Sequence, residues 1–364
     1  MRVLVTGGTG YVGSHTVVAL RGQGHEVRLL VRDPQRVTAA LTPLGVPAAD
    51  LGTVVGDVTD PAAVQRAVRD CEAVVHAGSV YSLDSRDARR IREVNVRGTA
   101  VVLGAAHRAG LDPIVYVSGV VALLQPNGQS LTPDSPVGRP PGPYLGSKAD
   151  AERVARRYQE AGAPVVITYP GAVYGPHDPH LGDGLRRLRN VLKGRYPIAP
   201  SGGYSIVDVR DVAKVHAAVL EPGRGPRRYL ASGTFVRPAD LVAGFAAVTG
   251  RRLSTITMPA RMLLPVARVV QLVQRVTPVH IPVEFEAIYF CRCANRCDDT
   301  TTRQELGVVP RDLLVTLADS VSWLVQQGQI TAREAGMLAT TLDDELQPVG
   351  GGELPANRQW WTGR

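Results

Sequence analysis

Long apolar runs, cysteines and aromatic residues are all scarce in this sequence. Of its 364 residues, 5% are aromatic and four are cysteine. No stretch reaches the roughly 18 uninterrupted apolar residues that a membrane-spanning helix needs, so no such helix is predicted. The first apolar strand follows Met1 and Arg2 directly, which argues against a signal peptide. We therefore expect a cytoplasmic protein.

Blocks of like charge are also missing. The net charge is +8, yet no run of five or more like charges occurs and few aromatic residues accompany the arginines. Nucleic-acid binding is therefore not indicated, and a generally basic surface is the simpler interpretation. With 44% hydrophobic and 20% charged residues, the composition is that of a globular protein. The length allows one large α/β domain with a smaller lobe, or two domains.

The four cysteines do not have the spacing of a metal site. Cys71 stands alone before an apolar strand and is expected to be a reduced core thiol. Cys291 and Cys293 would share one face of a predicted strand, with Cys297 just beyond it. Three thiols without an evident fourth ligand are a weak zinc pattern, so no metal is predicted.

A glycine-rich turn near the start of the chain is the strongest motif. Residues 3–5 form a short apolar, β-branched run, and Gly7, Gly10 and Gly13 follow before a helix-like pattern begins. A strand that turns tightly into a helix leaves the first helical N–H groups free, and these groups with the helix dipole suit a pyrophosphate. A glycine-rich structural turn is the alternative, but the flanking strand and helix favour a dinucleotide site.

Residues at the end of the second predicted strand, 25–31, bear on the choice of dinucleotide. Arg32 stands where this architecture meets the adenosine ribose, and an arginine there accommodates a 2′-phosphate. The acidic residue that would instead bond a 2′-hydroxyl, Asp33, comes one position late, and Arg36 could join the same anion pocket. NADP is therefore predicted, with NAD as the alternative.

Strands and helices alternate along the first two thirds of the chain, which predicts an α/β fold with a doubly wound parallel sheet. A smaller C-terminal lobe would bind the substrate. We expect the dinucleotide-binding domain at residues 1–170 and 205–232, the lobe at 171–204 and 233–330, and a tail at 331–364 that includes Trp360 and Trp361. The predicted strands are 3–5, 25–31, 52–58, 73–77, 114–117, 165–169 and 229–231, and the predicted helices include 61–69, 91–109 and 144–160.

Tyr144 and Lys148 lie one turn apart on the same face of the helix predicted at 144–160. A free tyrosine has a pKa near 10, which is too high for efficient proton transfer at neutral pH. A nearby ammonium would stabilise the phenolate and lower that pKa. Lys148 could also bond the nicotinamide ribose. Because a strand ending at Ser118 precedes the pair, we interpret the pair as catalytic.

Several stretches together resemble the extended short-chain dehydrogenase/reductase family over roughly residues 1–325. The resemblance implies an NAD(P)-dependent Rossmann enzyme in which Asp57 contacts the adenine and Tyr144 and Lys148 are catalytic. It also places Tyr11, Val12, Val58, His76, Ala77, Gly78, Asn95, Pro170 and Val173, with Lys148, at the cofactor. The matching segments are 6–13 (TGGTGYVG), 56–58 (GDV), 95–99 (NVRGT), 144–148 (YLGSK), 170–176 (PGAVYGP) and 207–213 (VDVRDVA).

Within that family, Arg32 and its surroundings look like the dihydroflavonol-reductase and 3β-hydroxysteroid-dehydrogenase-like branch, while residues 10–15 also resemble nucleotide-sugar epimerases. Two positions depart from the family. The third catalytic residue is usually a Ser or Thr at or just after a Ser-Ser pair, but here the strand reads Ser118-Gly119-Val120. Ser118 is the candidate for that role, with a Thr or Ser of the following loop, or a weakened activity, as the alternatives. Tyr169 also stands where the family often has Arg before Pro-Gly.

The leading hypothesis is an NADP-dependent oxidoreductase that interconverts a secondary alcohol and a ketone on a fairly apolar small molecule. A nucleotide-sugar epimerase or dehydratase with tightly bound NAD is one alternative, and a non-catalytic NAD(P)-binding sensor is another. The helix predicted at 261–276 is strongly apolar and carries Arg261, Arg268 and Arg275 at seven-residue spacing. A helix that covers the lobe with a solvated basic face is favoured for it. A peripheral membrane contact through 261–276 and a homodimer are the partner alternatives left open.

Overall fold

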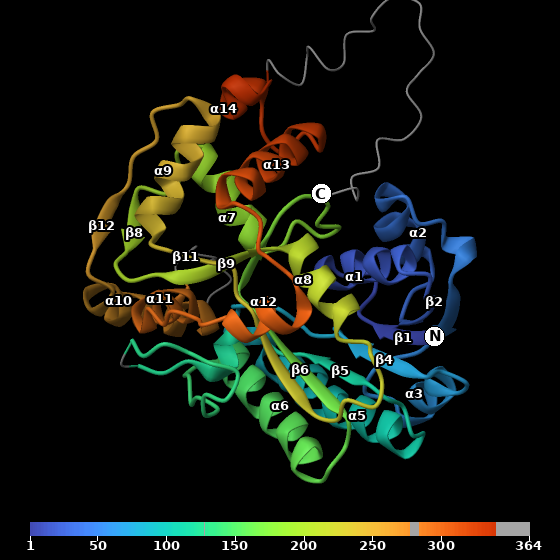
Figure 1. The fold of residues 1–364 in the computed structure, drawn as a ribbon. Helices are drawn as coiled ribbons and strands as arrows, with labels where there is room; N and C mark the ends of the chain where they lie inside the picture. Colours follow the sequence, from blue (N-terminus) through green and yellow to red (C-terminus); the bar gives the residue numbers. More distant parts are fainter. Residues whose placement is uncertain (127, 277–283, 340–364) are drawn as a thin grey trace, which may run out of the picture.

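A seven-stranded parallel sheet forms the centre of the molecule (Figure 1). The computed structural model describes residues 1–126, 128–276 and 284–339. The strand order is β10-β6-β5-β4-β1-β2-β3, with every neighbouring pair parallel. This confirms the predicted doubly wound sheet. The strands are β1 (Arg2–Thr6), β2 (Glu26–Val31), β3 (Gly52–Val55), β4 (Ala73–His76), β5 (Ile114–Val117), β6 (Val165–Pro170) and β10 (Arg227–Ala231).

Both faces of the sheet are buried, which explains why its strands read as short continuous apolar runs. One face packs against α1 (Tyr11–Gly22) and α8 (Val209–Ala218) through side chains such as Val17, Leu20 and Val212. The other face packs against α3 (Pro61–Val68), α5 (Thr99–Arg108) and α6 (Pro143–Glu160). Figure 1 shows these helices on the two sides of the sheet.

The second lobe contains two small sheets and most of the later helices. The three-stranded sheet has the order β11-β9-β7 and the two-stranded sheet pairs β12 with β8. β9 falls in the range predicted for the dinucleotide-binding domain but pairs with β7 and β11 instead, because the chain passes through the lobe before it enters α8. The strands of the lobe are β7 (Ala172–Tyr174), β8 (Ile198–Pro200), β9 (Tyr204–Asp208), β11 (Thr234–Val236) and β12 (Ile256–Met258).

The remaining helices complete the two layers and the lobe. Two of them, α13 and α14, start with a side chain that bonds a free N–H group of the first turn, Asp312 for α13 and Thr331 for α14. They are α2 (Gln35–Leu41), α4 (Ala88–Arg92), α7 (Asp183–Leu192), α9 (Pro238–Thr249), α10 (Ala260–Val276), α11 (Phe285–Cys293), α12 (Thr300–Leu306), α13 (Leu313–Gln326) and α14 (Ala332–Ala335). Short turns are η1 (Thr42–Leu44), η2 (Ala48–Asp50), η3 (Ser85–Asp87) and η5 (Val120–Leu123).

Three local predictions were wrong. The helix expected at 91–109 is interrupted by a π-helical segment, η4 (Glu93–Gly98), which connects α4 to α5. Cys291 and Cys293 lie on α11, not on a strand. Residues 331–339, assigned to the tail, contain α14 and pack into the lobe through the buried Ala335 and Ala339. Residues 340–364, with Trp360 and Trp361, lie outside the described part of the chain.

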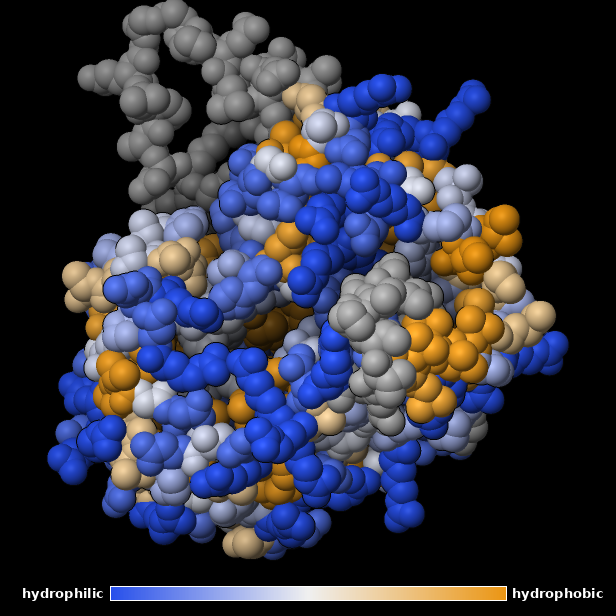
Figure 2. All heavy atoms as spheres, turned by 180° about the vertical axis from the view of Figure 1, so that it is seen from behind, coloured by the Kyte–Doolittle hydropathy of each residue, from blue (hydrophilic) through white to orange (hydrophobic). Residues whose placement is uncertain are grey.

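α10 keeps the predicted solvated basic residues, because Arg261 and Arg268 are exposed, but it also exposes apolar side chains to solvent. Figure 2 shows a hydrophobic patch on the surface over this helix. Among the residues that the structure describes, no helix is both long and apolar enough to cross a membrane.

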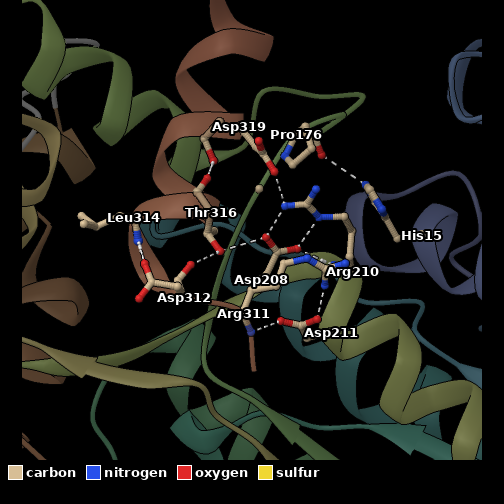
Figure 3. A network of polar contacts seen from close by, with 12 residues as sticks. His15, Pro176, Asp208, Arg210, Asp211, Arg311, Asp312, Leu314, Thr316 and Asp319 are labelled. Carbon is tan, nitrogen blue, oxygen red and sulfur yellow. Dashed lines mark hydrogen bonds and ion pairs between the residues drawn. The ribbon is translucent and has the colours of Figure 1, made fainter. Parts of the chain in front are cut away.

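A buried network of charges joins the central unit to the lobe (Figure 3). Asp208 caps α8 and accepts two hydrogen bonds from the Arg210 guanidinium, at 2.7 and 2.9 Å. The same guanidinium bonds Asp319 of α13 at 2.6 Å, and Thr316 of α13 donates to Asp208 at 2.9 Å. Burial acts to raise the pKa of Asp208, but the bonds from Arg210 outweigh it and the net pKa is lowered. Arg210 therefore connects α8 to α13.

Removing Arg210 should destabilise the protein strongly. In Arg210→Ala, the carboxylates of Asp208 and Asp319 lose their shared cation, and the side chain of Asp208 is fully buried. The expected loss in the free energy of unfolding is about 3–5 kcal/mol, as for other broken buried ion pairs. Urea unfolding measures it. Arg237→Ala is the matched control, because its pair with Asp240 is exposed and should contribute little to stability. Equal losses in the two variants would contradict this assignment.

Candidate active site

A cavity of about 470 Å³ lies between the central sheet and the lobe. On the side of the seven-stranded sheet, the cavity is lined by residues at the carboxyl ends of β1, β4, β5 and β6. The strand order reverses between β1 and β4, and ligands of such sheets bind at this point. The predicted site residues that line the cavity are Gly7, Gly10, Tyr11, Val12, Gly13, Ala77, Ser118, Tyr144, Lys148, Pro170 and Val173.

The glycine-rich turn forms one end of this cavity. Gly7 has a φ of +73°, and a Cβ there would meet the Ala77 carbonyl oxygen at 2.7 Å. The Gly10 N–H donates to the Gly7 carbonyl at 2.9 Å, and Gly10 is the N-cap of α1 without a side chain to bond the helix's first N–H groups. Those N–H groups therefore face the cavity, so the turn fits a pyrophosphate.

The β6–β7 segment closes over the start of α1. The Tyr11 hydroxyl donates to the Gly175 carbonyl at 2.7 Å, and His15 Nε2 lies 3.1 Å from the Pro176 carbonyl. Burial lowers the pKa of His15 to about 4, so its ring is neutral at pH 7. These contacts hold Pro170 and Val173, which lie on the same segment, beside the glycine-rich turn.

Arg32 follows the last residue of β2 and its side chain is exposed. Asp33, the nearby carboxylate, is occupied: one oxygen accepts from the Gln35 N–H at 3.0 Å and the other lies 3.6 Å from Arg36. These bonds do not involve Arg32, so its side chain at the end of β2 is available to a ligand. Arg36 is bound to Asp33.

Asp57 and Val58 follow β3 at the same edge of the sheet. The Asp57 carboxylate accepts from the Thr59 N–H at 2.9 Å and from the Thr59 hydroxyl at 2.8 Å, which sets the turn into α3. Val58 packs close to Gly78, where a Cβ would meet it at 3.4 Å. Arg32, Asp57, Val58 and Gly78 do not line the cavity itself, and their contacts with adenosine stay a prediction.

His76 and Asn95 occupy buried positions that hold the site together. His76 bridges Thr6 at 2.7 Å and Thr99 at 3.2 Å, and burial lowers its pKa to about 3. The Asn95 amide bonds both the N–H and the carbonyl of Val80 and donates to Ser147 of α6 at 3.0 Å. Neither side chain lines the cavity. The π-helical segment places Asn95 at this junction between the loop after β4 and α6.

Tyr144 and Lys148 line the cavity from the first turns of α6. The Tyr144 ring packs edge-on against Tyr81, with centroids 4.7 Å apart. The Lys148 ammonium donates to the Val117 carbonyl at 3.1 Å, and burial lowers its pKa to about 8. Burial also raises the pKa of Tyr144. Tyr144 therefore keeps its proton at neutral pH in this arrangement. That Lys148 lowers the pKa of Tyr144 stays a prediction.

The segment after β5 contains Ser118, the candidate for the third catalytic residue. Ser118 lines the cavity, and its buried hydroxyl has no hydrogen-bond partner among the residues that the structure describes. Gly119 has an extended backbone, and a Cβ there would lie 3.9 Å from Lys148 Cε. Val120 is 2% exposed and packs in the core. Ser118 is therefore the hydroxyl that this segment presents to the cavity, next to Gly119, which also lines it.

Tyr169, the second departure from the family pattern, lies in the core behind α6. Its hydroxyl donates to Glu152 at 2.7 Å, and the Arg156 guanidinium bonds both Glu152 at 2.7 Å and the Tyr169 oxygen at 3.2 Å. Arg156 of α6 thus provides a cation where the family often has an arginine next to Pro-Gly.

The lobe contributes residues that the sequence analysis missed, and Glu286 of α11 is the most informative. It is 2% exposed, and its carboxyl oxygens accept from the backbone N–H groups of Tyr144 at 3.3 Å and Leu145 at 2.7 Å. It therefore caps the helix that carries Tyr144. Burial raises the pKa of Glu286 to about 7. No local motif signals it, because the capping residue comes from a helix distant in sequence.

Comparisons with known proteins agree with this geometry. The model of the NAD dependent epimerase/dehydratase family matches residues 3–231. The chain belongs to this family. Sterol demethylase protein B of Methylococcus capsulatus is 29% identical over 91% of this chain and 100% of its own length. A Synechocystis protein given the provisional name dihydroflavonol 4-reductase is 30% identical over 90% of this chain and 95% of its own.

A comparison with solved structures also finds a similar fold. The crystal structure of gox2253 superposes with a TM-score of 0.76, is 29% identical, and covers 90% of this chain and 99% of its own. The present chain is thus an NAD(P)-dependent oxidoreductase of the extended short-chain dehydrogenase/reductase type, which confirms the predicted family. Among the described residues, no group of His, Cys, Asp and Glu could hold a metal ion.

Titration of Glu286 should change stability with pH. The folded protein holds this proton up to about pH 7, whereas the ordinary value is 4.5. Between those pH values the native state binds the extra proton, so the free energy of unfolding falls as pH rises. Glu286→Gln removes the titration, so its stability relative to wild type should rise by about 1–3 kcal/mol from pH 4.5 to pH 7.5.

Urea unfolding across this pH range measures the difference between the two proteins and cancels the titration of all other groups. Glu160→Gln, at the exposed end of α6, is the matched control and should track wild type. Parallel curves for wild type and Glu286→Gln would show that Glu286 does not hold its proton.

Proposed function

We propose that this NAD(P)-dependent oxidoreductase uses NADP and reduces a ketone on a fairly apolar small molecule. The observation that carries the proposal is the cavity beside Tyr144 and Lys148, whose walls include many aromatic and aliphatic side chains. The side chains that support an apolar substrate are Tyr81, Leu83, Val121, Leu145, Tyr174, Leu185, Tyr204 and Phe290. The name of one relative, sterol demethylase protein B, is in keeping with such a substrate.

The charged residues of the cavity favour an apolar substrate over a nucleotide sugar. Two arginines of α7 line it, but both have partners in the lobe: Arg187 bonds Glu284 at 2.9 Å and Arg186 bonds Asp183 at 2.5 Å. The cavity also contains the acidic groups Asp178 and Glu286. A nucleoside diphosphate needs unpaired cations or N–H groups at its phosphates, and these arginines are already neutralised. The epimerase alternative is therefore less well supported.

The residues of the chain have distinct roles in the reaction. When bound, the nicotinamide cofactor supplies or accepts the hydride. The glycine-rich turn would bind its pyrophosphate, and Lys148 would bond the nicotinamide ribose. Tyr144, which keeps its proton at neutral pH, donates that proton to the carbonyl oxygen as the alcohol forms. Ser118 bonds the same oxygen. The aromatic walls exclude water from this polar group.

Tyr144→Phe should lower turnover by roughly 10²- to 10⁴-fold, the usual contribution of a positioned acid, and leave NADPH affinity nearly unchanged. The measurement is NADPH oxidation over a panel of apolar ketones, with binding followed by NADPH fluorescence. Tyr158→Phe is the matched control, because it makes the same change near the other end of α6, outside the cavity.

Unimpaired turnover in Tyr144→Phe on the preferred ketone would refute the catalytic assignment. The same experiment separates the alternatives. NAD that stays bound through purification would favour an epimerase, and NADPH binding without turnover on any ketone would favour a sensor.

Arg32→Ala should weaken NADPH binding by roughly 1.5–3 kcal/mol, the range for a charged hydrogen bond, because the 2′-phosphate would lose its guanidinium. NADH binding should barely change. Titrations of both cofactors measure this, with the exposed Arg66→Ala on α3 as the control. An equal loss for NADPH and NADH would show that Arg32 does not discriminate between them.

A further inference from the structure

α10 exposes a continuous apolar stripe to solvent. Met262, Val266, Val269 and Leu272 recur at helical spacing, and 55–60% of each side chain is exposed. The opposite side of the helix is anchored by Ala260 and Ala267, which pack with Phe285 and Ile288 of α11. Ordinary surface helices put their apolar face inward. A contiguous exposed patch of this kind indicates an interaction surface.

The patch extends beyond the helix. Ile256 of β12 pairs in register with Ile198 of β8, and these side chains are 70% and 45% exposed. β12 ends two residues before α10 begins, so the strand pair and the start of the helix are neighbours in the chain. Figure 2 shows hydrophobic surface over this side of the molecule, bordered by hydrophilic residues.

Basic side chains border the apolar stripe. Arg261 and Arg268 are both exposed, and the Arg268 guanidinium lies 4.3 Å from the centre of the Phe285 ring. That contact places the Arg268 guanidinium beside α11, at the border between the exposed stripe and the packed side of the helix. An apolar face with arginines at its border, on a chain of net charge +8, is complementary to anionic lipid headgroups above acyl chains.

We propose that α10 lies flat on an anionic membrane surface, with its apolar stripe in the acyl boundary and its arginines among the headgroups. Its 17 residues are interrupted by Pro265 and flanked by arginines, which suits a helix in the interface rather than across it.

A second copy of the chain is a less favourable partner for the apolar surface of α10 than a membrane. In a two-fold dimer, the same patch faces itself. The arginines at the border of one copy would then lie near those of the other, and such like-charge contacts are unfavourable. A membrane has no such conflict, because its headgroups carry the opposite charge.

The proposed surface is connected to the cavity. α10 packs on α11, and Glu286 and Phe290 of α11 line the cavity. On the proposed function, an apolar substrate could pass from the membrane into this cavity over a short distance. That link depends on the proposed function, whereas membrane binding does not.

Co-sedimentation of the full chain with vesicles tests the proposal. Wild type should bind vesicles of phosphatidylcholine with 30% phosphatidylglycerol at least ten-fold more tightly than pure phosphatidylcholine vesicles, with the difference falling as salt is added. Val266→Asp/Val269→Asp should lose at least ten-fold of this binding, and Arg261→Glu/Arg268→Glu should lose the dependence on lipid charge. Val309→Asp, at an apolar side chain that is 68% exposed elsewhere, and Arg66→Glu are the matched controls.

Circular dichroism and NADPH binding should be unchanged in all four variants, which separates loss of membrane binding from misfolding or failure of the proposed function. Equal binding of wild type and Val266→Asp/Val269→Asp to anionic vesicles would overturn the proposal. So would a monomer–dimer equilibrium, measured by sedimentation velocity without lipid, that Val266→Asp/Val269→Asp abolishes while vesicle binding is absent from wild type.

Discussion

The contact between the glycine-rich turn and the ends of β1 and β4 is the constraint on which the site depends. A side chain at Gly7 would collide with the Ala77 backbone, and one at Gly13 would collide with the Gly7 carbonyl. Because glycine has no side chain, these two positions allow α1 to start this close to the sheet. As a result, the free N–H groups of α1 and the carboxyl ends of β4, β5 and β6 border one cavity. Cofactor position and catalytic position thus follow from a single steric requirement.

The lobe also helps to position the catalytic helix. Glu286 caps α6 from α11, directly at the backbone of Tyr144, and Arg210 connects α8 to α13 through carboxylates of both units. Arg210 and Asp208 bury charge at the junction, where a misplaced partner is costly. The position of Tyr144 at the start of α6 depends on how α11 of the lobe docks.

The chemistry of the lobe is consistent across the site and the surface. Inside the cavity, the two arginines of α7 are paired with acids, and aromatic and aliphatic side chains line much of the rest. On the outside, α10 presents an apolar stripe with exposed arginines beside it. An enzyme whose substrate partitions into membranes would need both features: a dry cavity to hold the substrate, and a surface that brings the cavity to the lipid.

Much of the fold was readable from local sequence, because parallel strands buried on both faces must be short apolar runs and a phosphate-binding turn must be rich in glycine. Residues 3–13 were recognised in this way, and the Tyr144–Lys148 pair, recognised from its spacing on one helix face, lines the same cavity. His76 and Asn95 were predicted at the cofactor from their motifs; their buried side chains do not line the cavity, because a motif position does not say which way a side chain points, and their contact with the cofactor stays a prediction. Cys291 and Cys293 were assigned to a strand because a short apolar run does not distinguish strand from helix. Glu286 could not have been found, since its role comes from a contact about 140 residues away in the chain. The sequence also showed that α10 was apolar with spaced arginines, but only packing against α11 decided that its apolar stripe faces solvent.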